Sequence, residues 1–334
     1  MVPKKEEKLD AIIFIDTNIF LDFYRISSSD ISMKYLDQIE LHKDIIITSS
    51  QVEMEFKKNR QKVILEGLSE FKKAADVKLS IPPIVQDSKS VEMLKASKKS
   101  LEEQHKKLVQ KISNIFVDPN KHDPVYKTFN KIFQNKSDIN LNRENDLRIG
   151  IRELAAKRFY LGYPPRKSAD TSYGDAINWE WIIDCAIKSK KHIIIVTRDT
   201  DYGAKYNGQP YLNDWLRQEF HQRVGARRKI FLTDKLSTAF KLVKIPVTPE
   251  MVKEENKLLE MTYSAYKEMI KNSIARVFEQ SRDLNNMSFG GTDNFMNYKI
   301  GLTYDSNENE IDDESQQSQN SDHSSSDGEP HDES

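Results

Sequence analysis

The chain of 334 residues is 37% hydrophobic and 31% charged, and its formal net charge at pH 7 is −1. Because it contains a single cysteine, Cys185, a disulfide framework and a cysteine-based zinc site are excluded, and we expect a reducing, cytoplasmic location. No apolar run approaches the roughly 20 residues of a membrane span, and residues 1–10 are charged rather than typical of a signal peptide, so we expect no membrane partner.

The charge is unevenly distributed along the chain. Residues 301–334 carry eleven Asp and Glu side chains and no Lys or Arg, so residues 1–300 hold 51 basic and 41 acidic side chains, a formal charge of +10. A basic body is compatible with a polyanionic partner, although surface lysines that serve solubility are the more common explanation. The acidic tail is too polar to bury a core, and we predict that it is disordered.

Two short apolar runs near the N-terminus predict buried parallel strands. They cover residues 11–15 and 44–48, after a flexible segment over residues 1–10. A helix follows over about residues 50–65, with an apolar stripe on one side and basic residues on the other.

The middle of the chain has a different character. Residues 84–162 are charged and helix-forming, with candidate helices over 90–116 and 142–160 and no good strand between them. We therefore predict a helical insertion, which ends before Pro164 and Pro165.

Strands and helices alternate again after the insertion. In chain order we expect a helix over 174–188, a strand over 192–197, a helix near 212–224, a strand over 229–232 and a helix over 233–243. This alternation is typical of an α/β fold with a parallel sheet, here formed by residues 11–245. Residues 246–300 would add a helical extension, with one long helix to about residue 281, before the tail over residues 301–334.

Four acidic residues stand just past a predicted strand or near the start of a predicted helix: Asp16, Glu55, Asp175 and Asp199. Since the carboxyl ends of parallel strands open on one edge of a sheet, acids far apart in the sequence can converge there. Clustered carboxylates are hard oxygen ligands that suit Mg²⁺ or Mn²⁺, and a cation relieves the repulsion among them. Taken singly, each acid also fits an ordinary role as a helix cap, a solvated helix residue or a turn residue.

These segments resemble the PIN-domain nucleases, and more closely a PIN-like branch with a long helical insertion. The resemblance covers about residues 11–240 and is carried by four ordered motifs: Asp16-Thr17-Asn18, Glu55 within QVEMEF, Asp175 within YGDAINW, and Thr197-Arg198-Asp199. It implies a PIN-like parallel sheet flanked by helices. It also implies a metal-dependent nuclease that uses Mg²⁺ or Mn²⁺ to cut RNA by attack of water, leaving 5′-phosphate and 3′-hydroxyl ends.

The resemblance implies a role for each acid. Asp16 and Asp199 would be central metal ligands, and Asp175 would bind metal or orient the attacking water. Glu55 would hold a second metal ion or accept a proton. Because the insertion follows this motif, Glu53 remains the alternative to Glu55.

Three further residues accompany these acids. By the same resemblance, Asn18 would hydrogen-bond a ligand carboxylate and Thr197 would fix the last loop. Asp201 is an additional acid that either assists in binding metal or faces solvent.

Basic residues near the same edge are candidate contacts for substrate phosphates: Arg25, Lys57, Arg60, Arg166, Lys167 and Arg198. Phosphate contacts would give affinity without sequence preference and a steep salt dependence. For each residue alone, a solvated surface charge is the more common explanation. Trp179 and Trp181 lie among apolar residues of one predicted helix, so we expect them in the core rather than stacked on bases.

Together these patterns predict a metal-dependent endoribonuclease whose substrate is single-stranded RNA. The alternatives are a catalytically silent nucleic-acid or protein-binding module on the same fold, and a nuclease that cuts DNA. A phosphatase of the haloacid-dehalogenase type is disfavoured, because Asn18 stands where that chemistry needs a second aspartate. The sequence leaves open the biological setting, and whether the chain forms a homo-oligomer or is restrained by an inhibitory partner.

Overall fold

The computed structural model describes residues 8–75, 80–166, 172–262 and 264, all within one structural unit over residues 1–273. Most of the segment predicted to be a flexible N-terminus, and all of the predicted acidic tail, lie outside the described residues. Within the described part of the chain, no helix combines the length and the apolar character needed to cross a membrane.

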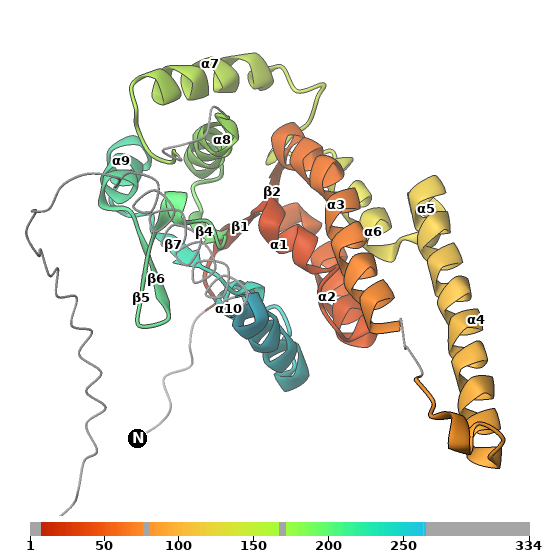
Figure 1. Cartoon of the computed structure of the whole chain (residues 1–334). Helices are drawn as coiled ribbons and strands as arrows, with labels where there is room; N and C mark the ends of the chain where they lie inside the picture. The colour runs from red at the N-terminus through yellow and green to blue at the C-terminus, as the bar shows by residue number, and fades with distance from the viewer. Residues whose placement is uncertain (1–7, 76–79, 167–171, 263, 265–334) are drawn as a thin grey trace, which may run out of the picture. The chain divides into compact units, whose positions relative to one another are not determined.

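A five-stranded parallel sheet lies at the centre of the fold, in the order β3-β2-β1-β4-β7 (Figure 1). Its strands are β1 (Ala11–Ile15), β2 (Ile46–Ser49), β3 (Asn140–Leu141), β4 (His192–Val196) and β7 (Ile230–Thr233). The central strands β1 and β4 pair in register from Ala11 opposite His192 to Ile15 opposite Val196. Both therefore end at the same edge, and the predicted α/β class with a parallel sheet is confirmed.

Helices from both ends of the chain flank this sheet. They are α1 (Thr17–Asp22), α2 (Ser29–Leu41), α3 (Ser50–Ala75), α8 (Gly174–Ser189), α9 (Asp214–Val224) and α10 (Leu236–Leu242), with a 3₁₀ turn η1 (Lys43–Ile45) before β2. The sheet strands read as apolar runs because they are covered on both faces. Trp179 and Trp181 of α8 are both 0% exposed, as predicted for core residues. Helix α3 continues ten residues beyond the predicted end at Leu65.

The insertion is helical as predicted, but part of it belongs to the core. It contains η2 (Pro83–Val85), α4 (Lys89–Val117), α5 (Pro119–His122), α6 (Pro124–Phe133) and α7 (Leu147–Tyr160). The expectation that it has no strand is wrong, because β3 pairs with β2 through Asn140 opposite Thr48. Two residues are too short a run for apolar periodicity to reveal. The ring centres of Phe129 of α6 and Phe20 of α1 are 4.4 Å apart, so α6 forms part of the hydrophobic core.

A hairpin that the hydrophobic pattern did not predict follows the last acidic motif. After the 3₁₀ turn η3 (Thr200–Tyr202), strands β5 (Gly203–Tyr206) and β6 (Gln209–Leu212) pair antiparallel. Asn207 and Gly208, with φ of 47° and 73°, form the turn, and this Asn-Gly pair is the local signal for such a hairpin. The predicted helix near 212–224 is therefore shorter at its start, where α9 begins at Asp214.

Part of the predicted C-terminal helical extension is also described. A helix covers residues 249–262 and packs on the domain through the buried side chains of Met251, Glu255 and Leu258. Beyond residue 264 the predicted long helix lies outside the described residues.

Candidate metal centre

The four predicted acids, Asp16, Glu55, Asp175 and Asp199, line a single pocket of about 320 Å³. Asp16 directly follows β1, and Asp199 stands three residues after the end of β4. Because β1 and β4 are adjacent and parallel, these two acids reach the same edge of the sheet. Glu55 comes from the second turn of α3 and Asp175 from the first turn of α8.

The carboxylate of Asp16 is held by hydrogen bonds from three residues. Its Oδ1 accepts the backbone N–H of Thr17 at 2.7 Å, so Asp16 also caps α1. Its Oδ2 accepts the Asn18 amide at 2.9 Å and the Thr197 hydroxyl at 2.6 Å. The resemblance predicted that Asn18 would contact a ligand carboxylate and that Thr197 would fix the last loop, and the hydrogen bond from Thr197 to Asp16 adds to these contacts. They fix the orientation of a carboxylate that is 3% exposed.

Glu55 is held in the same way by neighbours on two helices. Its Oε2 accepts the hydroxyl of Thr17 at 3.0 Å, and its Oε1 accepts the side-chain amide of Gln51 at 2.7 Å. The alternative acid, Glu53, does not line the pocket and forms an ion pair with Lys57 at 2.6 Å. The geometry therefore favours Glu55 over Glu53 as the second acid.

Gly174, at the start of α8, allows the close approach of α8 to α3. A Cβ atom at this position would lie 2.5 Å from Glu55 Oε1 and 2.7 Å from Gln51 Nε2. Any side chain here would displace the carboxylate of Glu55 or move Asp175 away from it. The glycine in the sequence YGDAINW is thus part of the site, a role that the motif alone did not reveal.

Asp201 lies close to two of the acids that line the pocket. Carboxylate oxygens of Asp175, Asp199 and Asp201 all lie within 4.8 Å of one another, which is close enough for one cation to bridge them. The 3₁₀ turn η3 carries Asp201 and continues to Tyr202, which is 0% exposed. The structure therefore places this additional acid with the predicted ones.

Burial and mutual repulsion among the carboxylates dominate the electrostatics of the pocket. Burial raises the pKa of Asp16 to about 7, and the charges of Asp199 and Glu55 act in the same direction, against the hydrogen bonds from Thr197 and Thr17. Burial also raises the pKa of the Tyr202 phenol, and all four acids add to this rise. The charges of four carboxylates that are distant in the sequence thus act on the phenol of Tyr202.

The donor set fits a hard divalent cation. Four carboxylates line the pocket, and carboxylate oxygens suit Mg²⁺ or Mn²⁺ better than a softer metal. The pKa of Asp16 is raised first by burial and then by the charges of Asp199 and Glu55, and a divalent cation would favour its ionised form against both effects. Several of the carboxylates are already oriented by hydrogen bonds, as in metal sites where neighbouring residues hold the ligands.

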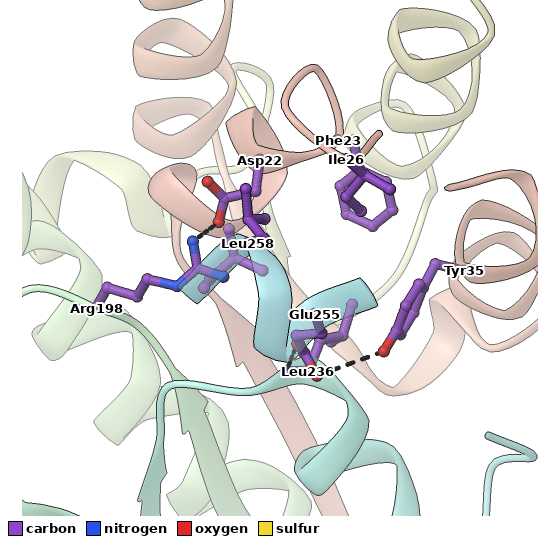
Figure 2. Close-up of a pocket in the computed structure, with 9 residues that line it drawn as sticks. Asp22, Phe23, Ile26, Tyr35, Arg198, Leu236, Glu255 and Leu258 are labelled. Carbon is purple, nitrogen blue, oxygen red and sulfur yellow. Dashed lines mark hydrogen bonds and ion pairs between the residues drawn. The ribbon is translucent and has the colours of Figure 1, made fainter. Parts of the chain in front are cut away.

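Arg198 does not line this pocket, although it precedes Asp199 directly. Figure 2 shows its guanidinium group directed at Asp22, at the end of α1, with which it forms an ion pair. The small cavity beside this pair has a volume of about 20 Å³, room for about one water molecule, and is also lined by Glu255 of the C-terminal helix. The predicted contact between Arg198 and a substrate phosphate therefore has no support in this arrangement.

Arg60 was a predicted phosphate contact, but its side chain is only 4% exposed. It forms an ion pair with Asp123 at 2.6 Å, donates to the Tyr24 hydroxyl at 3.0 Å and to the Ile115 carbonyl at 3.0 Å, and lies over the ring of Tyr126. A phosphate cannot reach a guanidinium enclosed in this way. We therefore assign Arg60 a structural role that joins α3 to α6.

The other predicted basic contacts are more exposed. Lys57 pairs with Glu53, and Arg25 pairs with Asp22 at 3.3 Å and Glu66 at 3.8 Å. Arg166 is exposed, with its guanidinium 4.7 Å from the centre of the Phe159 ring. Lys167 lies outside the described residues.

Sequence patterns did not single out two polar residues that line the pocket, Lys58 and Asn59. Both follow Glu55 on α3, at the spacing of three and four residues that puts side chains on one face of a helix. That spacing is the signal that could have identified them once Glu55 was chosen.

Comparison with known families agrees with this geometry. A family model described as a PIN domain matches residues 13–202, which is more than half of the chain. The matched range begins within β1, includes the insertion and ends at Tyr202, so it contains all the acids of the pocket. Searches of curated proteins and of solved structures found no match.

Proposed function

Because the chain belongs to the PIN domain family, we propose that it is a metal-dependent endoribonuclease that hydrolyses phosphodiester bonds of RNA. The observation that carries the proposal is the convergence of Asp16, Glu55, Asp175 and Asp199 on one pocket. PIN domains have a nuclease-type fold, and their activity usually depends on a metal ion. The acidic cluster supplies carboxylate ligands for such an ion.

The acids of the pocket would hold Mg²⁺ or Mn²⁺. Asp16 and Asp199 would be the central ligands, and Glu55, Asp175 and Asp201 would complete the set of donors. Divalent ions, when bound, neutralise charge on a phosphate, lower the pKa of a water nucleophile and stabilise a leaving oxygen. The proposed products carry 5′-phosphate and 3′-hydroxyl ends.

The protein's own residues would hold the carboxylates in the correct orientation. Thr197 and Asn18 donate to Asp16, and their hydrogen bonds favour its charged form. Thr17 and Gln51 each donate to one oxygen of Glu55 and hold its carboxylate in place. Since these donors are already in place, little reorganisation is needed when a cation and a phosphate enter the pocket.

Single-stranded RNA is the substrate that we propose, acted on in the cytoplasm. The formal charge of +10 over residues 1–300 supports a polyanionic substrate. The buried thiol of Cys185 fits a reducing compartment. Cleavage of DNA and a silent binding function are the alternatives that the following experiment separates.

Labelled single-stranded RNA and DNA of one sequence should be incubated with the protein in Mg²⁺, Mn²⁺ or EDTA. We expect RNA cleavage that requires the metal, and fragments whose new 5′ ends carry a phosphate removable by a phosphatase. Asp175→Asn, nearly isosteric and at a partly exposed position, should remain folded and lose on the order of a thousandfold in rate. Cleavage that persists in EDTA, or in Asp175→Asn at the wild-type rate, would contradict this mechanism, and cleavage of DNA alone would correct the substrate.

A further inference from the structure

We propose that Lys58 and Asn59 form a phosphate-binding subsite for the RNA strand at the edge of the acidic pocket. The proposal deepens the function proposed above and rests on it. Of the described residues that line the pocket, Lys58 is the one that carries a positive charge, and it stands among four carboxylates. It would hold a backbone phosphate beside the bond to be cut.

The basic residues of α3 lie on two faces of the helix, one directed at α6 and the other at the pocket. Lys57 and Arg60 face α6, where both lie over the ring of Tyr126 and pair with Glu53 and Asp123 respectively. Glu55, Lys58 and Asn59 are on the face that lines the pocket. Of these two cations, Arg60 is buried and Lys57 is paired with Glu53, and neither lines the pocket.

Lys58, in contrast, is exposed, so its ammonium group can reach a ligand. Within the described part of the chain, no acidic side chain forms an ion pair with it. A lysine ammonium group is a strongly hydrated point charge on a flexible stem, which suits contact with a phosphate oxygen. When protonated it has no lone pair, so it cannot replace a carboxylate as a metal ligand.

The negative charge of the pocket favours a cationic side chain where a phosphate enters. The phosphates of an RNA strand that enters this pocket are repelled by each of the four carboxylates that a metal ion does not neutralise. A cation at the edge offsets part of that repulsion, and the neutral amide of Asn59 can donate to the same phosphate without adding charge. The subsite would contact the backbone alone, so it would fix the position of the strand without selecting its sequence.

Lys62 offers a matched control on the same helix. It is exposed like Lys58 and lies one turn further along α3, but it does not line the pocket. Nonspecific attraction of RNA to a basic surface would respond to either lysine. A defined subsite would respond to Lys58 alone.

The test compares Lys58→Ala, Lys58→Arg and Lys62→Ala with the wild-type protein, using one labelled single-stranded RNA. For Lys58→Ala we expect KM to rise about tenfold with a smaller change in kcat, because one charge-assisted contact is lost. The slope of log affinity against log salt should fall in magnitude by about 0.7, the value for one phosphate of a single strand. Lys58→Arg should retain most of the affinity, and Lys62→Ala should stay near wild type.

Mn²⁺ affinity, measured by calorimetry without RNA, distinguishes the subsite from a structural role. It should not decrease in Lys58→Ala, whereas a variant that disturbed Glu55 would bind the metal less well. A wild-type KM and salt slope in Lys58→Ala, or equal losses in Lys58→Ala and Lys62→Ala, would overturn the subsite while leaving the nuclease proposal intact. A wild-type protein that neither binds nor cuts RNA would instead overturn the proposed function, and the subsite with it.

Discussion

The hydroxyl group of Thr197 donates a hydrogen bond of 2.6 Å to Asp16 and accepts one of 3.0 Å from the backbone N–H of Asp199. A single side chain therefore links the acids that follow two neighbouring strands. The backbone N–H of Thr197 also donates a hydrogen bond to the carbonyl of Thr233, at the end of β7. These hydrogen bonds at the ends of the sheet strands thus fix the position of Asp16 relative to Asp199.

Thr197→Val should weaken the metal site without unfolding the protein. Valine has nearly the same shape but no hydroxyl, so Asp16 loses a donor that stabilises its charged form, and Asp199 loses an acceptor for its N–H. We expect Mn²⁺ affinity and kcat to fall about 10- to 100-fold, the usual effect of removing a group that orients a metal ligand. Thr197→Ser keeps the hydroxyl and should stay near wild type. Calorimetric Mn²⁺ affinity at the wild-type value in Thr197→Val would show that this hydrogen bond does not support the site.

Two glutamates on α3 provide a test of which acid serves the pocket. Glu55→Gln should abolish most RNA cleavage, because Glu55 lines the pocket and is oriented by Thr17 and Gln51. Glu53→Gln should leave cleavage within about twofold, since its carboxylate only pairs with the partly exposed Lys57. Cleavage rates at saturating Mn²⁺ give the comparison. The reverse pattern would reassign the second acid to Glu53.

The raised pKa of Asp16 predicts a pH-dependent stability of the metal-free protein. In the folded state this pKa is about 7, above its ordinary value of 3.8, so between these values the folded chain binds more protons than the unfolded chain. The free energy of unfolding in EDTA should therefore fall as the pH rises through this window. Apparent Mn²⁺ affinity should rise over the same range, because the metal binds the ionised carboxylate.

Asp16→Asn isolates this contribution from that of other titrating groups. The difference in Tm between wild type and Asp16→Asn in EDTA, measured from about pH 5 to about pH 8, should change in favour of the variant as the pH increases. A difference in Tm that does not vary with pH would show that Asp16 ionises normally in the folded protein.

The positions of the acids could be predicted from the sequence because they depend on backbone topology. Asp16 and Asp199 each follow an apolar run, and parallel strands bring their carboxyl ends together whatever the side-chain packing. Glu55 and Asp175 followed from the ordered motifs. Strand β3 and the hairpin of β5 and β6 were not predicted, because two residues and an exposed ribbon carry no apolar pattern.

The roles of the basic residues could not be predicted in the same way, because they depend on the direction of each side chain. Arg198 adjoins Asp199 in sequence but reaches Asp22, on the side of the C-terminal helix (Figure 2). Lys57 and Lys58 are consecutive, yet one pairs with Glu53 and the other lines the pocket. Consecutive residues on a helix are about 100° apart around its axis, so the two lysines face different neighbours, and in the sequence only their spacing from Glu55 separates them.

Arg60→Met tests whether Arg60 supports the fold rather than the substrate. Its buried ion pair with Asp123 joins α3 to the start of α6, and removal of one partner leaves a carboxylate that is 2% exposed without its counter-charge. Such a loss costs about 3–5 kcal/mol of unfolding free energy. Arg60→Met should therefore unfold at a lower denaturant concentration, while Lys62→Met, at an exposed position of the same helix, should not. Because a neutral side chain at position 123 removes the unpaired charge, and asparagine keeps an oxygen that can cap α6 at the N–H of Tyr126, Arg60→Met combined with Asp123→Asn should recover much of the stability.

At a temperature where both proteins are folded, Arg60→Met should retain the wild-type salt dependence of RNA binding. Wild-type stability together with a flatter salt slope would return Arg60 to the substrate surface.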